Sequence, residues 1–137
     1  MQTGVVRYLL DTNTVSDAVK GRADVLARLE RAPVGCVAIS SVTLGEIRYG
    51  LAWKHRPTGL TRIVEEFLRR VDVLQWGDRE ANHYGTLRAE CRRKGITIGA
   101  LDLLIASQAH AAGAVLVTGD KTLRSIPGLK TENWRAS

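Results

Sequence analysis

The chain has 137 residues, 45% of them hydrophobic and 25% charged, a composition that predicts a single globular domain, residues 1–137, with a real core. The longest apolar stretch is interrupted by an acid and by glycines, and the N-terminus lacks a signal-peptide pattern, so we expect no membrane contact and a cytoplasmic location. Twenty Lys and Arg against fourteen Asp and Glu give a net charge of +6, which suits a polyanionic partner but also simply keeps a protein in solution.

Cysteine and histidine form no pattern that predicts a zinc or disulfide site. Cys36 and Cys91 are isolated, without CxxC spacing, and are expected to be buried free thiols. The three histidines, His55, His83 and His110, lie far apart along the chain and are expected to be structural or on the surface.

Stretches typical of strands and helices alternate along the chain. The expected strands are residues 5–10, 36–39, 71–74 and 114–117, with an added edge strand at 129–131. The expected helices are one from Thr12 to about Lys20, 23–31, 41–53, one with helical spacing between Leu60 and Val71, one capped by Asp78 and running to about Lys94, one that carries Asp102 and ends near Gly113, and a short one after Asp120. This alternation predicts an α/β fold of three layers, α/β/α, around a mainly parallel central sheet of four or five strands.

Asp102 is the only formally charged residue between Gly95 and Gly119. A carboxylate among leucines and isoleucines takes up a proton, finds a cation or costs stability. Two interpretations stay open on this stretch alone: a functional acid, or an acid in the first turn of a helix, where the helix dipole favours it. Glu46 is likewise a single acid in an uncharged stretch, because it is the only charged residue from Ala32 to Ile47.

Glu46 lies four residues after Val42 and therefore shares that residue's face of the expected helix. A structural role stays open, because Arg48 or Arg56 could pair with its carboxylate. Arg88, on the next long helix, falls near an apolar stripe and is expected to be partly buried and paired.

Asp11 and Asp120 each follow an expected buried strand. Taken alone, each is best explained as a helix cap or a turn residue. The carboxyl ends of parallel strands, however, lie on one rim of a sheet, which is where such folds keep their sites. Because Glu46 and Asp102 are expected in helices packed against the same sheet, the four acids can share one cleft on that rim.

Carboxylates a few ångströms apart repel one another unless a cation compensates them. Oxygen ligands without His or Cys favour Mg²⁺ or Mn²⁺ over zinc. When the four acids are set aside, 20 bases face 10 acids and the rest of the chain carries +10. An acidic metal site on a basic body fits hydrolysis of the phosphodiester bonds of a nucleic acid.

Four motifs that span nearly the whole chain carry a family resemblance. In order, they are LLDTNTVSDAVKG, ISSVTLGEIRYGL, GITIGALDLLIASQA and VLVTGDKTLRSIPGLKTENW. They resemble the successive motifs of the PIN-domain family, most closely those of its VapC-type toxin ribonucleases. The resemblance implies a metal-dependent endoribonuclease, the toxin of a type II toxin–antitoxin system, in which Asp11, Glu46, Asp102 and Asp120 hold Mg²⁺ or Mn²⁺ and act as the catalytic acids. It also implies an RNA substrate, a cognate VapB-type antitoxin that covers the cleft, and a homodimer.

Other positions match the family less uniformly. By resemblance, Thr12, Asn13 and Thr118 are accessory polar residues that help to order the site. Leu123 is a departure, because many relatives carry an aromatic residue three positions after the fourth acid. Other relatives have Asn where Asp120 stands, so this acid is expected to act either directly or through a bound water.

Two other classes of phosphate-handling protein are excluded. A haloacid-dehalogenase-like phosphotransferase needs Asp-x-Asp, but position 13 is Asn, and the GxxxxGK[ST] loop of phosphate-loop NTPases is absent. A non-catalytic module that binds nucleic acid or protein stays open as the alternative. For an enzyme, no Ser, Cys or His has an evident activating partner in the sequence, so water is the predicted nucleophile and a 5′-phosphate the predicted product end.

Overall fold

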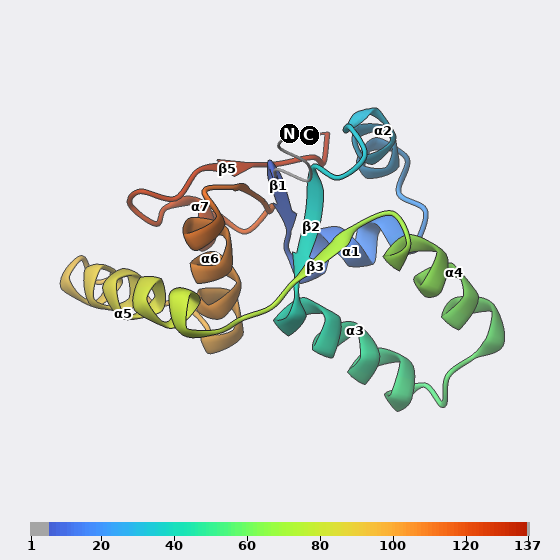
Figure 1. The fold of residues 1–137 in the computed structure, drawn as a ribbon, viewed down its shortest axis with the longest axis horizontal. Coiled ribbons are helices and arrows are strands. Elements are labelled where there is room, and N and C mark those ends of the chain that lie inside the picture. The colour runs from blue at the N-terminus through green and yellow to red at the C-terminus, as the bar shows by residue number, and fades with distance from the viewer. Residues whose placement is uncertain (1–5, 137) are drawn as a thin grey trace.

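The computed structural model describes residues 6–136 and shows a five-stranded sheet within that range. The strands are β1 (Tyr8–Leu10), β2 (Val37–Ser40), β3 (Asp72–Leu74), β4 (Val115–Val117) and β5 (Thr131–Glu132). They lie in the order β3-β2-β1-β4-β5, and each neighbouring pair is parallel (Figure 1). The prediction of a mainly parallel sheet of four or five strands is confirmed.

Helices cover both faces of this sheet. They are α1 (Thr12–Val19), α2 (Ala23–Arg31), α3 (Ser41–Trp53), α4 (Thr58–Leu68), α5 (Asp78–Arg93), α6 (Ala100–Ala112) and α7 (Lys121–Arg124). In Figure 1, α5, α6 and α7 lie on one side of the strands and α2 and α4 on the other, which confirms the three-layer α/β/α fold. None of the helices within residues 6–136 is long and apolar enough to cross a membrane.

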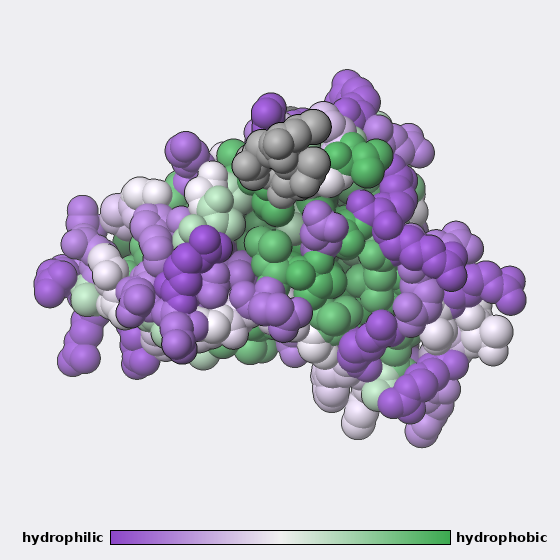
Figure 2. Space-filling view, in the orientation of Figure 1, coloured by the Kyte–Doolittle hydropathy of each residue, from purple (hydrophilic) through white to green (hydrophobic). Residues whose placement is uncertain are grey.

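Successive side chains of the short strands enter opposite layers, as the pleat of a strand requires. One set packs against α5, α6 and α7: Leu9, Ala38 and Leu116. The other set packs against α1, α2 and α4: Leu10, Ile39 and Val117. The strands are therefore apolar on both faces, and Figure 2 shows apolar residues gathered where β2 and β3 lie in the view, with hydrophilic residues over α5.

Helices α2 and α3 begin and end at the predicted residues. For α3 the reason is local, because the Ser40 hydroxyl accepts the Val42 N–H at 3.1 Å and caps the helix. The start of α5 differs from the prediction. Gly77, not Asp78, is its N-cap, since the Glu80 side chain reaches back and its Oε1 accepts the Gly77 N–H at 2.9 Å.

Three further predictions need correction. The strand predicted at 5–10 begins at Tyr8, and Val5 lies outside the described residues. Arg88 is exposed, not partly buried, because its guanidinium lies over the Tyr84 ring and donates to the Tyr84 hydroxyl at 3.0 Å. Both cysteines are free as predicted, but only Cys91 is buried, while Cys36 is half-buried.

Candidate active site

The carboxyl ends of β1 and β4 are tied together at the centre of the sheet. The Asp11 N–H donates to the Val117 carbonyl at 3.1 Å, and the Thr14 hydroxyl donates to the same carbonyl at 3.1 Å. From here the chain enters α1 on one face of the sheet after β1, and α7 on the other face after β4. Asp11 therefore stands at the topological switch point, where open parallel sheets bind their ligands.

Asp11 uses one carboxylate oxygen for structure. Its Oδ1 accepts the Thr14 N–H at 2.8 Å and caps α1, so the helix-cap interpretation is correct for this oxygen. Its Oδ2 accepts no hydrogen bond from the described residues, and among them only Thr61 Oγ1 is a fully buried side-chain polar atom without a partner. Although the residue as a whole is only 3% exposed, Oδ2 thus remains open to a ligand.

Asp11, Glu46 and Asp102 line one open cavity of about 420 Å³, which we call the acidic cavity. The other described residues that line it are Thr12, Asn13, Gly99, Ala100, Leu101 and Ile105. None of these nine residues is a Lys, Arg or His. The structure therefore brings three of the four predicted site residues together, from the start of α1, from α3 and from the start of α6, without a cation among the residues that surround them.

Asp102 lies in the first turn of α6, and the residues around it oppose its negative charge. Burial raises the pKa of its carboxyl above the ordinary value, and the negative charges of Asp120 and Asp11 raise it further. No Lys or Arg of residues 6–136 forms an ion pair with it. A cation bound in the cavity would relieve this cost.

Glu46 has no basic partner within residues 6–136. Arg48, one of its two predicted structural partners, instead pairs with Glu65 of α4 at 2.5 Å, on the surface. Arg56, the other, adopts a left-handed backbone conformation with φ of 51° just after α3 and forms no ion pair within the same range. The predicted pairing of Glu46 with either arginine is therefore wrong, and the half-buried Glu46 lines the acidic cavity.

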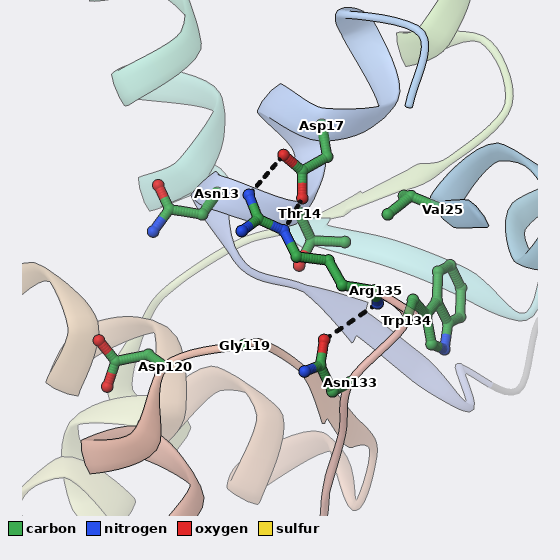
Figure 3. Close-up of a pocket in the computed structure, with 9 residues that line it drawn as sticks. All are labelled: Asn13, Thr14, Asp17, Val25, Gly119, Asp120, Asn133, Trp134 and Arg135. Atoms are coloured by element: carbon green, nitrogen blue, oxygen red, sulfur yellow. Dashed lines mark hydrogen bonds and ion pairs between the residues drawn. The ribbon is translucent and has the colours of Figure 1, made fainter. Parts of the chain in front are cut away.

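Asp120 lies slightly apart from the other three acids. Its Oδ1 caps α7 by accepting the Leu123 N–H at 3.0 Å, and its own N–H donates to Thr118 Oγ1 at 3.0 Å. It lines a neighbouring cavity of about 150 Å³, shown in Figure 3, and Asn13 lines both cavities. Because its charge raises the pKa of Asp102, Asp120 still belongs to the same electrostatic environment.

The accessory positions have structural explanations. Thr12 donates its hydroxyl to Thr43 at 3.3 Å, which ties the start of α1 to α3. Thr118 is buried, and its hydroxyl holds the turn before Asp120. Leu123, the departure from the family pattern, is a core residue with 1% exposure and packs in the layer that contains α6.

The donor set fits a hard divalent cation, although the described residues form no preformed site. Within residues 6–136, no three His, Cys, Asp or Glu side chains already stand in an arrangement that could hold a metal ion. Mg²⁺ does not require one, since it binds through one or two carboxylates and keeps several waters. The open Oδ2 of Asp11 and the unpaired carboxylates of Glu46 and Asp102 therefore suit Mg²⁺ or Mn²⁺ by their chemistry.

The residues that line the neighbouring cavity from the C-terminal side were not predicted from the sequence. Arg135 donates from Nε and Nη2 to the two Asp17 oxygens at 2.6 and 2.7 Å, and its N–H donates to Asn133 Oδ1 at 3.0 Å (Figure 3). Asp17 and Arg135 are 118 positions apart, so no local pattern could have linked them.

Comparisons with known proteins agree with this architecture. The model of the PIN domain family matches residues 8–129. Ribonuclease VapC2 of Haemophilus influenzae is 33% identical over 132 residues, which are 95% of this chain and 99% of the relative. The tRNA(fMet)-specific endonuclease VapC of Salmonella typhimurium is 34% identical over 95% of this chain and 99% of its own length.

Among solved structures, the chain is similar to one in the crystal structure of DNA-bound VapBC from Salmonella typhimurium. The TM-score is 0.87 at 34% sequence identity, and the match covers 95% of this chain and 99% of that one. Since the family model covers most of the chain and these relatives align along nearly their full length, the chain belongs to the PIN-domain family, among its VapC-type members.

Proposed function

We propose that the chain is a metal-dependent endoribonuclease that hydrolyses RNA phosphodiester bonds and is the toxin of a type II toxin–antitoxin pair. The observation that carries the proposal is the acidic cavity, in which three carboxylates meet without a basic residue on a chain whose other residues, 20 bases and 11 acids, carry +9. The names of the relatives, a ribonuclease and a tRNA(fMet)-specific endonuclease, support the same reaction class. Because its substrate is cellular RNA, such a toxin acts in the cytoplasm.

The acids have distinct proposed roles. Asp11 and Asp102 hold Mg²⁺ or Mn²⁺, Glu46 completes the ligand set or orients the attacking water, and Asp120 acts directly or through a bound water. When bound, such an ion polarises the phosphoryl oxygens and makes water a better nucleophile near neutral pH. The Thr14 N–H bond to Asp11 Oδ1 fixes the Asp11 side chain and leaves its other carboxylate oxygen free to bind the ion.

The residues of the acidic cavity favour water as the nucleophile. No Ser, Cys or His is among the described residues that line it, and its only hydroxyl, on Thr12, already donates to Thr43. Attack by water on phosphorus expels the 3′ oxygen and leaves a 5′-phosphate on the downstream fragment. A ribonuclease that uses the 2′-OH of the RNA instead leaves a 2′,3′-cyclic phosphate.

Cleavage of total RNA by the wild-type chain and by Asp11→Asn tests the proposal. We expect wild-type cleavage with Mg²⁺ or Mn²⁺, loss of cleavage in excess chelator and in the variant, and 5′-phosphate ends. RNA binding that persists without any cleavage would instead identify the non-catalytic module. Cyclic phosphate ends, or full activity in chelator, would refute water-dependent hydrolysis at a metal site.

The proposed antitoxin partner has a matching surface. An apolar groove of about 180 Å³ lies between α1, α3 and α4, with Val19, Ile47 and Leu60 among its lining residues. Thr12 and Glu46 line both this groove and the acidic cavity. An apolar antitoxin segment in the groove could thus extend an arginine to the acids and exclude a metal ion.

Coexpression tests the partner. The chain alone should arrest growth, Asp11→Ala should abolish that arrest, and the cognate VapB-type antitoxin should neutralise the wild type. Ile47→Asp should keep cleavage but escape neutralisation, because a charge on the groove floor opposes an apolar segment. The family resemblance also leads us to propose a homodimer, which light scattering of the isolated chain measures directly.

A further inference from the structure

Two cavities adjoin the acidic cavity, one through the shared residue Asn13 and one through neighbouring residues of the chain, and they differ in charge. The neighbouring cavity of Figure 3 is lined by two acids, Asp17 and Asp120, and its one arginine, Arg135, is already paired with Asp17. The other cavity, a pocket of about 320 Å³, is lined by two arginines and no acid. We call this second one the α5–α6 pocket; its lining residues are Arg88, Cys91, Arg92, Gly95, Ile96, Thr97, Ile98 and Leu103.

The α5–α6 pocket is continuous along the chain with the acidic cavity. Ile98 and Leu103 line the pocket, while Gly99 and Asp102, next to them in sequence, line the acidic cavity. The two cavities are therefore separated only by the segment from Ile98 to Leu103, and this proximity allows a linear ligand at Asp102 to reach the pocket.

The floor of the pocket is apolar and fixed. Cys91 and Leu103 are buried, and Ile96 and Ile98 pack against the same core. Gly95, with φ of +69°, turns the chain back at the end of α5, so that the Ile96 N–H can donate to the Cys91 carbonyl at 2.8 Å. Such a floor offers a flat apolar group a rigid surface.

The rim of the pocket carries free positive charge. Arg92 is exposed and forms no ion pair within residues 6–136. Arg88 is paired only with Tyr84, over whose ring it lies at 5.9 Å from the centroid, and this contact holds its guanidinium in place without neutralising it. The hydroxyl of exposed Thr97 adds a hydrogen-bonding group.

We propose that the α5–α6 pocket binds a nucleotide of the RNA beside the bond that is cut, with the base on the apolar floor and the backbone phosphates at Arg88 and Arg92. Guanidinium groups match phosphate oxygens with paired N–H donors, and single-stranded RNA presents unstacked bases to apolar surfaces. This inference rests on the proposed ribonuclease function and gives the RNA a direction across the molecule, away from Asp17 and Asp120 and toward α5.

Arg31 offers a matched control. Like Arg92, it is an exposed arginine in the last turn of a helix and forms no ion pair within the described residues. It lines a different pocket with Arg7, which directly precedes β1, and thus lies at the amino ends of the strands, opposite the acidic cavity. Arg31→Ala and Arg92→Ala remove the same charge, the first near the amino ends of the strands and the second from the α5–α6 pocket.

The test measures binding of a short single-stranded RNA in chelator, in an Asp102→Asn background, so that no RNA is cut and repulsion by the empty site is reduced. We expect Arg92→Ala to weaken binding by about 10-fold and to reduce the slope of log Kd against log salt by about 0.7, the value for one phosphate contact on a single strand. Arg31→Ala should leave both quantities close to the background. Thermal unfolding of each variant confirms that it is folded.

Steady-state cleavage with Mn²⁺ gives a second measurement. In the wild-type background, Arg92→Ala should raise KM and leave kcat within about two-fold, because the lost contact is uniform binding of a part of the RNA that does not react. Equal losses of RNA binding in Arg92→Ala and Arg31→Ala would refute nucleotide binding in the pocket. General attraction between the basic protein and the RNA would then explain the binding. A wild-type chain that cuts no RNA would refute the proposed function itself, which is a different outcome.

Discussion

Helices α5 and α6 begin in the same way but surround their first-turn acids differently. Glu80 and Asp102 are each the third residue of a helix whose N-cap is glycine. Glu80 is 5% exposed, and its carboxylate accepts the Gly77 N–H at 2.9 Å and the Arg79 Nε at 3.3 Å. Asp102 accepts no hydrogen bond from the described residues and faces two other acids.

The two carboxyl pKa values move in opposite directions as a result. Burial raises the pKa of Glu80, but hydrogen bonds from the Gly77 and Glu80 N–H groups and from Arg79 outweigh it, so the net pKa is lowered. For Asp102, burial and the charges of Asp120 and Asp11 all raise the pKa. The position of an acid in a helix therefore does not decide the direction of its pKa shift. The first turn of a helix can supply partners for an acid, as it does for Glu80. An acid in the same position without such partners is better explained by ligand binding than by a contribution to stability.

The largest expected effect is on RNA cleavage, which should depend on Asp102 but not on Glu80. Asp102→Asn should lower RNA cleavage by a factor of at least about 100, as expected for losing a charge that acts on the reacting groups. Glu80→Gln should leave cleavage close to wild type at a temperature where the variant is folded. Initial rates on one RNA substrate with Mn²⁺ measure both, and comparable losses would remove the distinction between the two helix starts.

Metal binding should follow the same division. Titration calorimetry should detect Mn²⁺ binding to the wild type and to Glu80→Gln, and at least about 10-fold weaker binding to Asp102→Asn. Unchanged affinity in Asp102→Asn would contradict its role as a ligand, even if cleavage were lost.

Stability in the absence of metal should move in opposite directions. Glu80→Gln should destabilise the fold by about 1–3 kcal/mol, because it weakens the charged partner of the Gly77 N–H at a buried helix start. Asp102→Asn should raise the unfolding midpoint, because it removes repulsion with Asp11 and Asp120. Urea unfolding of both variants in chelator gives the two signs, and a loss of stability in Asp102→Asn would mean that its charge has a stabilising partner.

The pH dependence of stability gives a smaller and sharper contrast. Because the folded pKa of Asp102 lies above its ordinary value of 3.8, the folded state keeps a proton that the unfolded state has lost, and stability falls as pH rises through that interval. Glu80 has a lowered folded pKa, so its contribution is present above its ordinary value of 4.5 and is lost as pH falls through the folded pKa. The free energy of unfolding of the metal-free protein should be measured between pH 3 and 7, roughly the span of these titrations. The fall in stability with rising pH should disappear in Asp102→Asn, and the fall in stability with falling pH should disappear in Glu80→Gln.

The smallest expected effect concerns two histidines that lie in contact between α5 and α6. His83 Nδ1 and His110 Nδ1 are 2.7 Å apart. The pKa of His110 is lowered, mainly by burial and to a smaller extent by the charge of His83. Protons therefore bind the unfolded state first as pH falls below the ordinary histidine value of 6.5, and stability should fall there. His110→Gln should flatten that part of the pH profile without altering the part controlled by Asp102.

The sequence was sufficient to predict the order of the elements and to single out four acids, three of which line one cavity, because both depend on local patterns. The bounds of α2 and α3 follow from apolar spacing and from the Ser40 cap, and the acids stand where buried strands end or where apolar helices carry a single charge. The N-cap of α5 was predicted wrongly, because Asp78 suits a cap by type, while the reach of the Glu80 side chain decides the outcome.

Contacts between distant segments could not be predicted in the same way. The pairing of Arg48 with Glu65 rather than Glu46, and the contact of the two histidines across α5 and α6, depend on how helices pack. The charge difference between the two cavities that adjoin the acidic cavity likewise appears only when Arg135 pairs with Asp17. A count of bases and acids along the chain gives a net charge, but it does not show which part of the surface carries arginines without an acidic partner.

The hydrogen bond from Thr14 to the Val117 carbonyl also has a consequence for how the protein is made. The two residues are 103 positions apart, and the switch point around Asp11 exists only when β4 lies beside β1. At about 5–20 residues per second, a ribosome takes on the order of 5–20 s to synthesise the chain between them. A growing polypeptide therefore cannot assemble its acidic cavity while most of it is still being translated, and the proposed ribonuclease activity cannot appear in any new molecule until its synthesis is nearly complete.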